Sequence, residues 1–170
     1  MMLNDAKLDE MWDAIHDGDC KKIDALVRRL GVDTRVEGDD WNFLHMALDT
    51  ITIPPNPDVI RHLIALGVDV NARDIDMWTP LHFAARTQNS RVVKLLIDAG
   101  AEIDAVDNEG ITPLHQCLLE RPCNLEVAEM LLAAGADGGG AVRKFVNAVS
   151  APDIPAIRAL LEKYAKKKKK

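Results

Sequence analysis

Residues 79–84 read Thr79-Pro80-Leu81-His82-Phe83-Ala84, and 33 residues later the chain reads Thr112-Pro113-Leu114-His115-Gln116-Cys117. An earlier and more degraded copy is Asn42-Phe43-Leu44-His45-Met46-Ala47. A motif that returns at a fixed period of this size indicates a stack of similar supersecondary units, none of which can bury its apolar face alone.

A second motif follows each hexapeptide. Residues 65–72 read Ala-Leu-Gly-Val-Asp-Val-Asn-Ala, residues 98–105 read Asp-Ala-Gly-Ala-Glu-Ile-Asp-Ala, and residues 133–137 begin the pattern again. Gly67 and Gly100 are also 33 residues apart. Two motifs with one period therefore support the same repeat independently.

The residue types within the repeat predict helices with defined ends. The hydroxyl of Thr79 or Thr112 can cap a helix, and the proline that follows suits the first helical position, where its missing N–H is no loss. Leu81, Ala84 and Ala85 recur at helical spacing. Gly67, Gly100 and Gly135 each follow a second helix, where a left-handed cap is needed.

These motifs resemble those of the ankyrin-repeat family, and the resemblance covers about Leu3 to Tyr164. It implies a β-turn finger, two antiparallel helices and a loop in each unit, and hence an all-α repeat solenoid of about five units with atypical end caps. We expect one domain over residues 1–165 and a disordered lysine tail over residues 166–170. The expected units are residues 3–30, 31–66, 67–99, 100–134 and 135–164.

Two units carry insertions between their helices. The second unit is four residues longer than the third, within residues 50–57, and the fourth is two residues longer, at residues 121–124. Insertions of this kind lie on surface loops and often help to form a binding face. Ile51 and Ile53 either fold back onto the helices or contact a partner.

The charge of the chain is unevenly distributed. Its 27 acidic residues outnumber 21 basic ones, and five of the basic residues are the terminal lysines 166–170, so 16 basic residues oppose 27 acidic ones elsewhere. An acidic body disfavours nucleic-acid binding by the folded domain and favours a basic partner. The lysine run is a tag remnant, a solvated end or a patch for nucleic acid or anionic lipid.

The sequence predicts neither membrane insertion nor secretion. No stretch approaches the roughly 20 apolar residues that span a bilayer. Residues 1–10 are polar and acidic and lack the basic and apolar regions of a signal peptide. We therefore expect a cytoplasmic protein with no membrane partner.

No catalytic or metal-binding constellation is visible, so we predict no enzyme activity, no cofactor, no metal site and no catalytic residue. His45, His82 and His115 occupy equivalent positions, which stacking separates by about 8–10 Å, too far for one zinc ion. Family resemblance gives this histidine a hydrogen-bonding role in the turn. Gly138–Gly140 lacks the preceding strand of a dinucleotide site. Cys20, Cys117 and Cys123 form no Cys-x-x-Cys pair and are interpreted as buried or incidental thiols.

The resemblance places partner contacts on the turn tips and on the exposed side of the first helix. Trp41 and Trp78 fall at matching positions there and either bind a partner or lie flat on their own repeats. Met77 occupies the position of the turn glycine Gly110, so either the turn is reshaped or Met77 is kept for an apolar contact. The candidate partner-binding residues are Asp39, Trp41, Asp49, Arg73, Ile75, Asp76, Met77, Trp78, Arg86, Asn108, Glu109, Ile111 and Glu120.

The function expected from these features is binding, and inhibition, of a basic partner protein through a concave acidic face by a chain that is monomeric when free. Small acidic ankyrin proteins are similar to the immunity proteins with which bacteria neutralise their own toxins. The alternative is a regulatory adaptor or inhibitor of a signalling or transcription protein. An enzyme or cofactor carrier would need a convergent polar pocket, for which the sequence has no motif.

Overall fold

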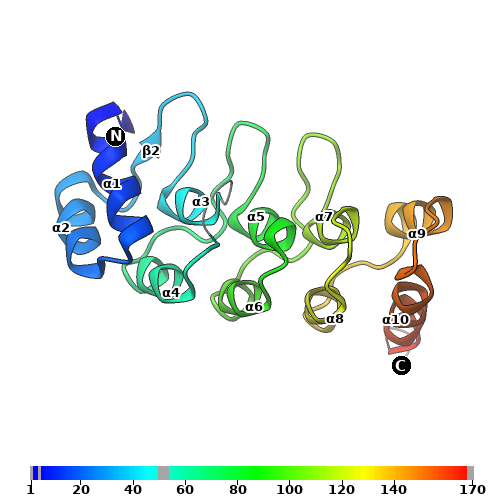
Figure 1. The fold of residues 1–170 in the computed structure, drawn as a ribbon. Helices are drawn as coiled ribbons and strands as arrows, with labels where there is room; N and C mark the ends of the chain where they lie inside the picture. The colour runs from blue at the N-terminus through cyan, green and yellow to red at the C-terminus, as the bar shows by residue number, and fades with distance from the viewer. Residues whose placement is uncertain (1, 4, 50–53, 168–170) are drawn as a thin grey trace.

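A computed structural model describes residues 2–3, 5–49 and 54–167, and within these ranges ten helices follow one another in five consecutive pairs (Figure 1). Ile51 and Ile53 lie outside the described residues. The predicted all-α repeat solenoid is confirmed. The helices are α1 (Asp5–Asp17), α2 (Cys20–Leu30), α3 (Phe43–Leu48), α4 (Pro57–Ala65), α5 (Pro80–Thr87), α6 (Ser90–Asp98), α7 (Pro113–Leu119), α8 (Leu125–Ala133), α9 (Gly140–Ala148) and α10 (Ile154–Lys167).

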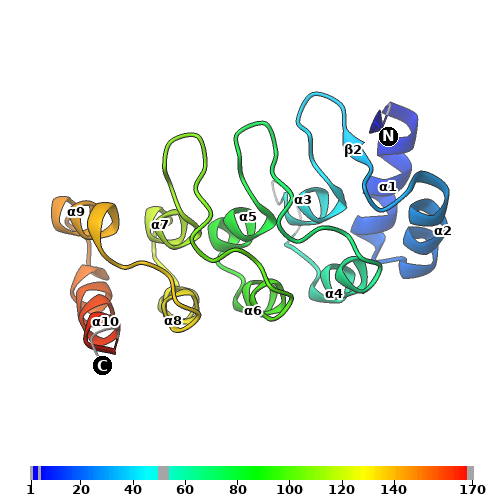
Figure 2. The ribbon, with the colours of Figure 1, turned by 180° about the vertical axis from the view of Figure 1, so that it is seen from behind.

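The pairs stack side by side in two layers. Helices α3, α5 and α7 form the inner layer, below three extended turns that we call fingers, and α4, α6 and α8 form the outer layer (Figures 1 and 2). Helix α5 packs against both α3 and α7, and α6 packs against both α4 and α8. Each unit therefore touches its neighbours rather than distant parts of the chain, as expected for a solenoid.

The helix ends follow the predicted chemistry. Thr112 accepts a hydrogen bond from the His115 N–H (3.3 Å), and Pro113 takes the first helical position. Thr79 and Pro80 hold the same places at the start of α5. After the second helices, Gly67, Gly100 and Gly135 have φ values of 88°, 86° and 110°. The left-handed turn predicted at these glycines is confirmed.

The core is a set of aliphatic columns that run through the stack. Leu44, Leu81 and Leu114 are fully buried at equivalent positions of the inner helices. Leu63, Leu96 and Leu131 form the matching column in the outer helices and are also fully buried. Because adjacent units share this core, the fingers are held on a rigid base.

The two ends of the stack differ from its middle. At the N-terminal end, β1 (Met2–Leu3) pairs in parallel with β2 (Arg35–Val36), a short ladder that an all-α description omits. At the C-terminal end, α10 extends to Lys167, and residues 168–170 of the predicted lysine tail are outside the described ranges. None of the described helices is both long and apolar enough to cross a membrane.

Candidate protein-binding surface

The three fingers are joined to one another by backbone hydrogen bonds at their tips. The Ile75 N–H donates to the Asp39 carbonyl (3.1 Å), and the Asn108 N–H donates to the Asp76 carbonyl (3.1 Å). We call the surface formed by residues 37–41, 74–78 and 107–111, together with the exposed side of α3, α5 and α7, the finger face. These bonds tie each finger to the next, and Figure 2 shows the three fingers side by side on the same side of the stack.

A buried aspartate shapes each of the last two fingers. Asp74 accepts hydrogen bonds from the backbone N–H groups of Asp76 (3.0 Å) and Trp78 (2.7 Å). Asp107 does the same for Glu109 (2.9 Å) and Ile111 (2.8 Å). Burial raises the pKa of Asp74, and the hydrogen bonds that it accepts oppose this rise. Both carboxylates thus hold the turns and are largely withdrawn from solvent.

The turn itself requires a left-handed residue, whichever side chain stands there. Gly110 has φ 77°, and the equivalent Met77 and Asp40 have φ 64° and 57°. Of the two alternatives for Met77, the reshaped turn is therefore wrong. A non-glycine residue in this region costs about 1–2 kcal/mol, and the Met77 side chain is 39% exposed.

Two of the repeat histidines connect a helix of one unit to the finger of the next. The Nε2 atoms of His45 and His82 lie 3.1 Å from the carbonyl oxygens of Trp78 and Ile111, to which they donate. Their Nδ1 atoms accept from the N–H groups of Asn42 (3.2 Å) and Thr79 (3.1 Å). The hydrogen-bonding role predicted for this histidine is confirmed at both positions.

This pattern requires a neutral imidazole, because a protonated ring has no acceptor nitrogen. Burial lowers the pKa of His45 from 6.5 to about 4 and also lowers the pKa values of His82 and His115.

The third repeat histidine, His115, contacts an aromatic ring of the next unit: the ring centroids of His115 and Phe145 are 5.0 Å apart. Within the described residues, no group of three or more His, Cys, Asp or Glu side chains is arranged to hold a metal ion.

A groove of about 330 Å³ lies between the last two fingers and α7. Three of its side chains are carboxylates, and no lysine or arginine lines it among the residues that the structure describes. The apolar part of the wall comes from Trp78, Ile111 and the exposed Leu119. The lining residues are Asp76, Trp78, Asp107, Asn108, Glu109, Ile111, Gln116 and Leu119.

The groove therefore brings together five of the residues predicted from the sequence: Asp76, Trp78, Asn108, Glu109 and Ile111. Sequence reasoning missed Asp107 and Gln116. Both are largely buried, and they line the groove together with Asp76 and Trp78 of the preceding unit. The available signal was the equivalence of Asp107 and Asp74, five residues before each hexapeptide threonine.

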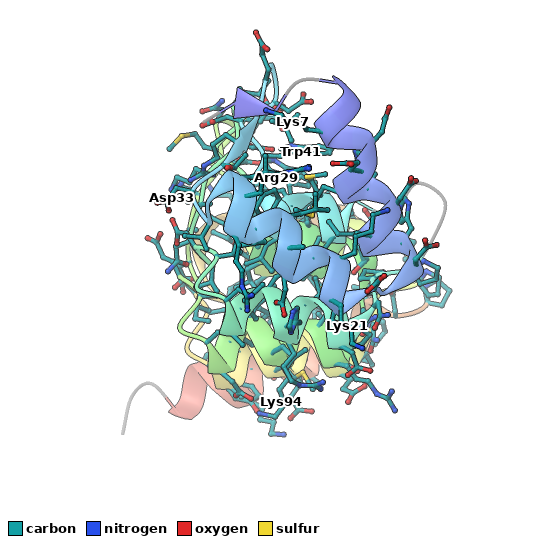
Figure 3. The ribbon with its side chains drawn as sticks, turned by 90° about the vertical axis from the view of Figure 1, so that its left-hand side faces the viewer. Lys7, Lys21, Arg29, Asp33, Trp41 and Lys94 are labelled. Carbon is teal, nitrogen blue, oxygen red and sulfur yellow. The ribbon has the colours of Figure 1, made fainter. Side chains whose placement is uncertain are left out.

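The tryptophans are partly buried in an aromatic cluster. Trp41 meets Phe83 edge-on, with ring centroids 5.7 Å apart, and its side chain acts to lower the pKa of Asp74. Trp78 stacks on His82 of its own repeat (5.9 Å) and meets Phe83 edge-on (5.2 Å). Trp78 thus lies on its own repeat, whereas Trp41 contacts the next one. Figure 3 places Trp41 near the finger side of the stack, away from Lys94 at the outer edge.

The two arginines predicted to bind a partner are engaged within the chain. Arg73 donates to the Val106 carbonyl (2.8 Å) and pairs with Glu102 (3.0 Å). The Arg86 guanidinium lies 5.3 Å from the Trp78 ring centroid and pairs with Asp49 (3.3 Å). These contacts stiffen the surface and neutralise Asp49 and Glu102, leaving the groove carboxylates without such compensation.

The remaining predicted residues divide by exposure. Asp39, Ile75 and Met77 are exposed at the finger tips, and Ile75 is 57% exposed. Glu120 follows α7 and is half-buried; its Oε1 lies 3.5 Å from the Gln116 Nε2. Apolar tips beside an acidic groove are features of a protein-binding surface.

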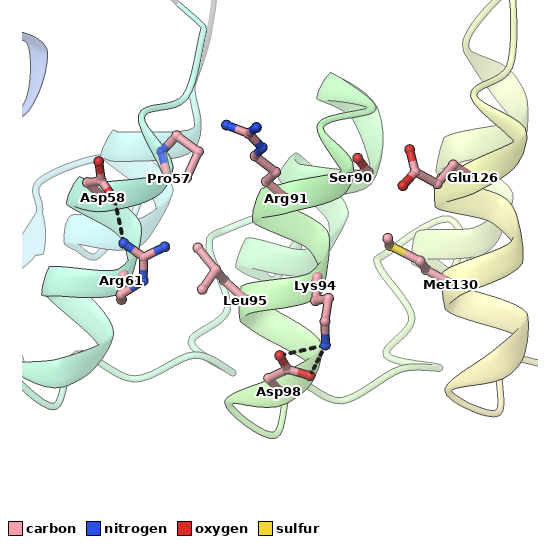
Figure 4. Close-up of a pocket in the computed structure, with 10 residues that line it drawn as sticks. All are labelled: Pro57, Asp58, Arg61, Ser90, Arg91, Lys94, Leu95, Asp98, Glu126 and Met130. Carbon is pink, nitrogen blue, oxygen red and sulfur yellow. Dashed lines mark hydrogen bonds and ion pairs between the residues drawn. The ribbon is translucent and has the colours of Figure 1, made fainter.

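A second groove, of about 510 Å³, lies on the outer helices (Figure 4). Arg61, Arg91 and Lys94 balance Asp58, Asp98 and Glu126 in number. Arg61 pairs with Asp58, and Lys94 with Asp98 (2.8 Å), each within one helix. This outer groove is larger than the finger-face groove but has no excess charge.

Comparisons with known proteins agree with the architecture. Residues 44–139 match the family described as ankyrin repeats (3 copies). That span includes the second and third fingers and helices α4 to α8 in full. No curated protein is significantly similar in sequence to the chain.

Proposed function

The chain belongs to the ankyrin-repeat family, whose repeats are protein–protein interaction modules, and from this premise we propose that it binds a basic partner protein through the finger face. The observation that carries the proposal is the finger-face groove, which is lined by the exposed Asp76 and Glu109 and the largely buried Asp107 and by no basic residue among those that the structure describes. A lysine or arginine of the partner fits this groove, with its aliphatic stem against Ile111 and Leu119.

The exposed tips supply the apolar part of the same interface. Ile75, Met77 and Val106 are the large apolar side chains exposed on the second and third fingers. Affinity in protein interfaces comes mainly from a few apolar and aromatic contacts, whereas complementary charge sets association rate and choice of partner. The tips and the groove together provide both elements.

We further propose that binding inhibits the partner by covering a basic functional surface. A nuclease toxin is a partner of this kind, because its substrate cleft must be basic to hold phosphates. The chain would then act as an immunity protein, and this extension rests on its size, charge and family. A regulatory adaptor would use the same face without blocking its partner's activity.

The test is affinity capture with three immobilised baits. The wild-type chain is compared with Asp76→Lys/Glu109→Lys in the finger-face groove and with Asp98→Lys/Glu126→Lys in the outer groove. The two variants change net charge equally, and all four positions are exposed. We expect a basic protein to be retained by the wild type and the outer variant and lost from the groove variant.

Equal retention of the partner by all three baits would contradict the proposed site. Equal loss of the partner from both variants would show that the interaction is only nonspecific charge attraction. The captured protein is then assayed for its own activity at increasing ratios of the chain. Loss of activity that is complete at one equivalent supports an inhibitor. Unchanged activity supports the adaptor.

A further inference from the structure

Two cysteines that are six residues apart in the sequence face each other below the surface. Cys117 lies on α7, and Cys123 lies in the link between α7 and α8. Their Sγ atoms are 3.9 Å apart, and the residues are 0% and 8% exposed. Both are free thiols. A disulfide needs a sulfur separation of about 2.05 Å, so each sulfur has to move by about 1 Å.

The backbone around Cys123 is fixed by the units on either side. The Cys123 N–H donates to Asp153 Oδ2 (3.0 Å), which also pairs with Arg121 (3.0 Å). On the other side, the Asn124 side chain donates to the Gln88 carbonyl (3.0 Å). This clamp holds Cys123 opposite Cys117.

The two thiols have different acidities. The hydrogen bond from Cys117 lowers the pKa of Cys123, with the nearby Arg121 acting in the same direction. The same hydrogen bond, together with burial, raises the pKa of Cys117. Cys123 is thus the thiol that ionises first, and it lies beside the exposed Arg121 and Pro122, from where a small oxidant can approach.

We propose that Cys117 and Cys123 are a redox modification site that closes to an intramolecular disulfide by exchange with a small disulfide such as oxidised glutathione. The Cys123 thiolate attacks one glutathione sulfur and releases one glutathione thiolate. Cys117, on losing its proton, then attacks Cys123 Sγ and releases the second glutathione. Two protein thiols are oxidised, and one glutathione disulfide is reduced to two thiols.

The bond has a defined place relative to the finger face. Cys117 is two residues before Leu119, which lines the finger-face groove, and Glu120 comes next. Oxidation would therefore tie the end of α7 to the link that the neighbouring units hold. This site is distinct from the groove, and its test requires no partner protein.

The experiment uses the full chain with Cys20→Ser, which removes the third thiol. The folded protein is equilibrated with mixtures of reduced and oxidised glutathione, blocked with N-ethylmaleimide and digested after Glu residues without reduction. Cleavage at Glu120 separates the two cysteines, so their peptides remain joined only through a disulfide. We expect mass spectrometry to detect the two peptides joined by a disulfide. The mass of the joined pair should be lower than the summed masses of the two reduced peptides by two hydrogen atoms.

Comparison with the unfolded chain shows whether the fold preorganises the pair. The effective concentration of the two thiols is expected to be at least about tenfold higher in the folded chain than in concentrated guanidinium chloride. In the Cys117→Ser variant, the reaction should stop at a mixed disulfide between Cys123 and glutathione. In the Cys123→Ser variant, Cys117 should remain largely unmodified. A lower effective concentration in the folded chain, or two thiols that both stay alkylatable, would overturn the proposal.

Discussion

The finger-face groove and the outer groove lie on opposite sides of the same repeats and differ in how their charges are compensated. The outer groove is lined by three basic and three acidic side chains, and two ion pairs form within single helices. In the finger-face groove, three carboxylates converge without a basic residue. The outer groove has the larger volume, so the distinguishing property of the candidate binding face is its uncompensated charge.

The difference arises from backbone geometry. Residues three and four apart on a helix are neighbours, so a helix such as α6 can pair its own charges, as Lys94 and Asp98 do. Finger residues face the next finger instead, and like charges recur there with the repeat, as at Asp39, Asp76 and Glu109. The periodic sequence that builds the fold therefore also concentrates charge on the finger face.

The largest expected effect is a loss of stability in acid that originates on the finger side. The pKa of His45 is about 4 in the folded chain and 6.5 in the unfolded chain, so His45 is neutral when folded. Its contribution to the free energy of unfolding is therefore fully present above pH 6.5 and is lost as the pH falls towards 4. Lowering the pH from 7 to 5 should reduce the free energy of unfolding by about 2 kcal/mol through His45 alone. The lowered pKa values of His82 and His115 act in the same direction.

Urea unfolding at both pH values measures this loss. The variant His45→Gln/His82→Gln should be less stable at pH 7 and should lose less on acidification than the wild type. An identical acid loss in the variant would show that the histidines linking helices to fingers are not its source.

The next effect concerns affinity for the captured partner. Asp76→Asn/Glu109→Gln removes two groove charges with little change of shape and should weaken binding about 30-fold, or about 2 kcal/mol. It should also flatten the dependence of affinity on salt. The matched outer variant Asp58→Asn/Asp98→Asn should change affinity less than about twofold. Calorimetric titration at two salt concentrations compares them, and similar losses in both variants would remove the distinction between the grooves.

The substitution Met77→Gly on the finger face should change stability and partner affinity in opposite directions. Glycine relieves the left-handed strain at φ 64° and should raise the free energy of unfolding by about 1 kcal/mol. It also removes an exposed apolar side chain, so partner affinity should fall. Denaturant unfolding and titration of one preparation test both statements. A variant that gains stability and keeps full affinity would show that Met77 makes no partner contact.

The smallest effect belongs to the outer groove. Lys94→Ala removes an exposed pair with Asp98 and should change stability by about 0.3 kcal/mol or less. Its partner affinity should be unchanged. A large loss of either property would mean that the outer groove contributes more than its balanced charges indicate, and the same unfolding and titration measurements detect it.

The fold could be predicted because its signals are local and repeated. A threonine cap, a proline and a cap glycine each act within one turn of helix, and the period places them in register. The site was predicted only in part. Arg73 and Arg86 were proposed for partner contact, yet both bond within the chain, because their reach across one repeat depends on how the units stack.

Other features depend on the same stacking. The groove that Asp107 and Gln116 line is also lined by Asp76 and Trp78 of the preceding unit, so it is formed by two adjacent units. The proximity of Cys117 and Cys123 results from the path of residues 120–124, which Gln88 and Asp153 of the flanking units fix. The spacing of residues within one repeat therefore does not predict the contact between Cys117 and Cys123, because that contact depends on three consecutive repeats.

The most direct test of the finger face as the binding site is hydrogen exchange of the chain alone and with the captured partner. We predict slower exchange for the amides of residues 74–78 and 107–111, with little change in α6 and α8. Protection confined to α6 and α8, with unchanged exchange in the fingers, would contradict the central claim and place the binding site on the outer groove.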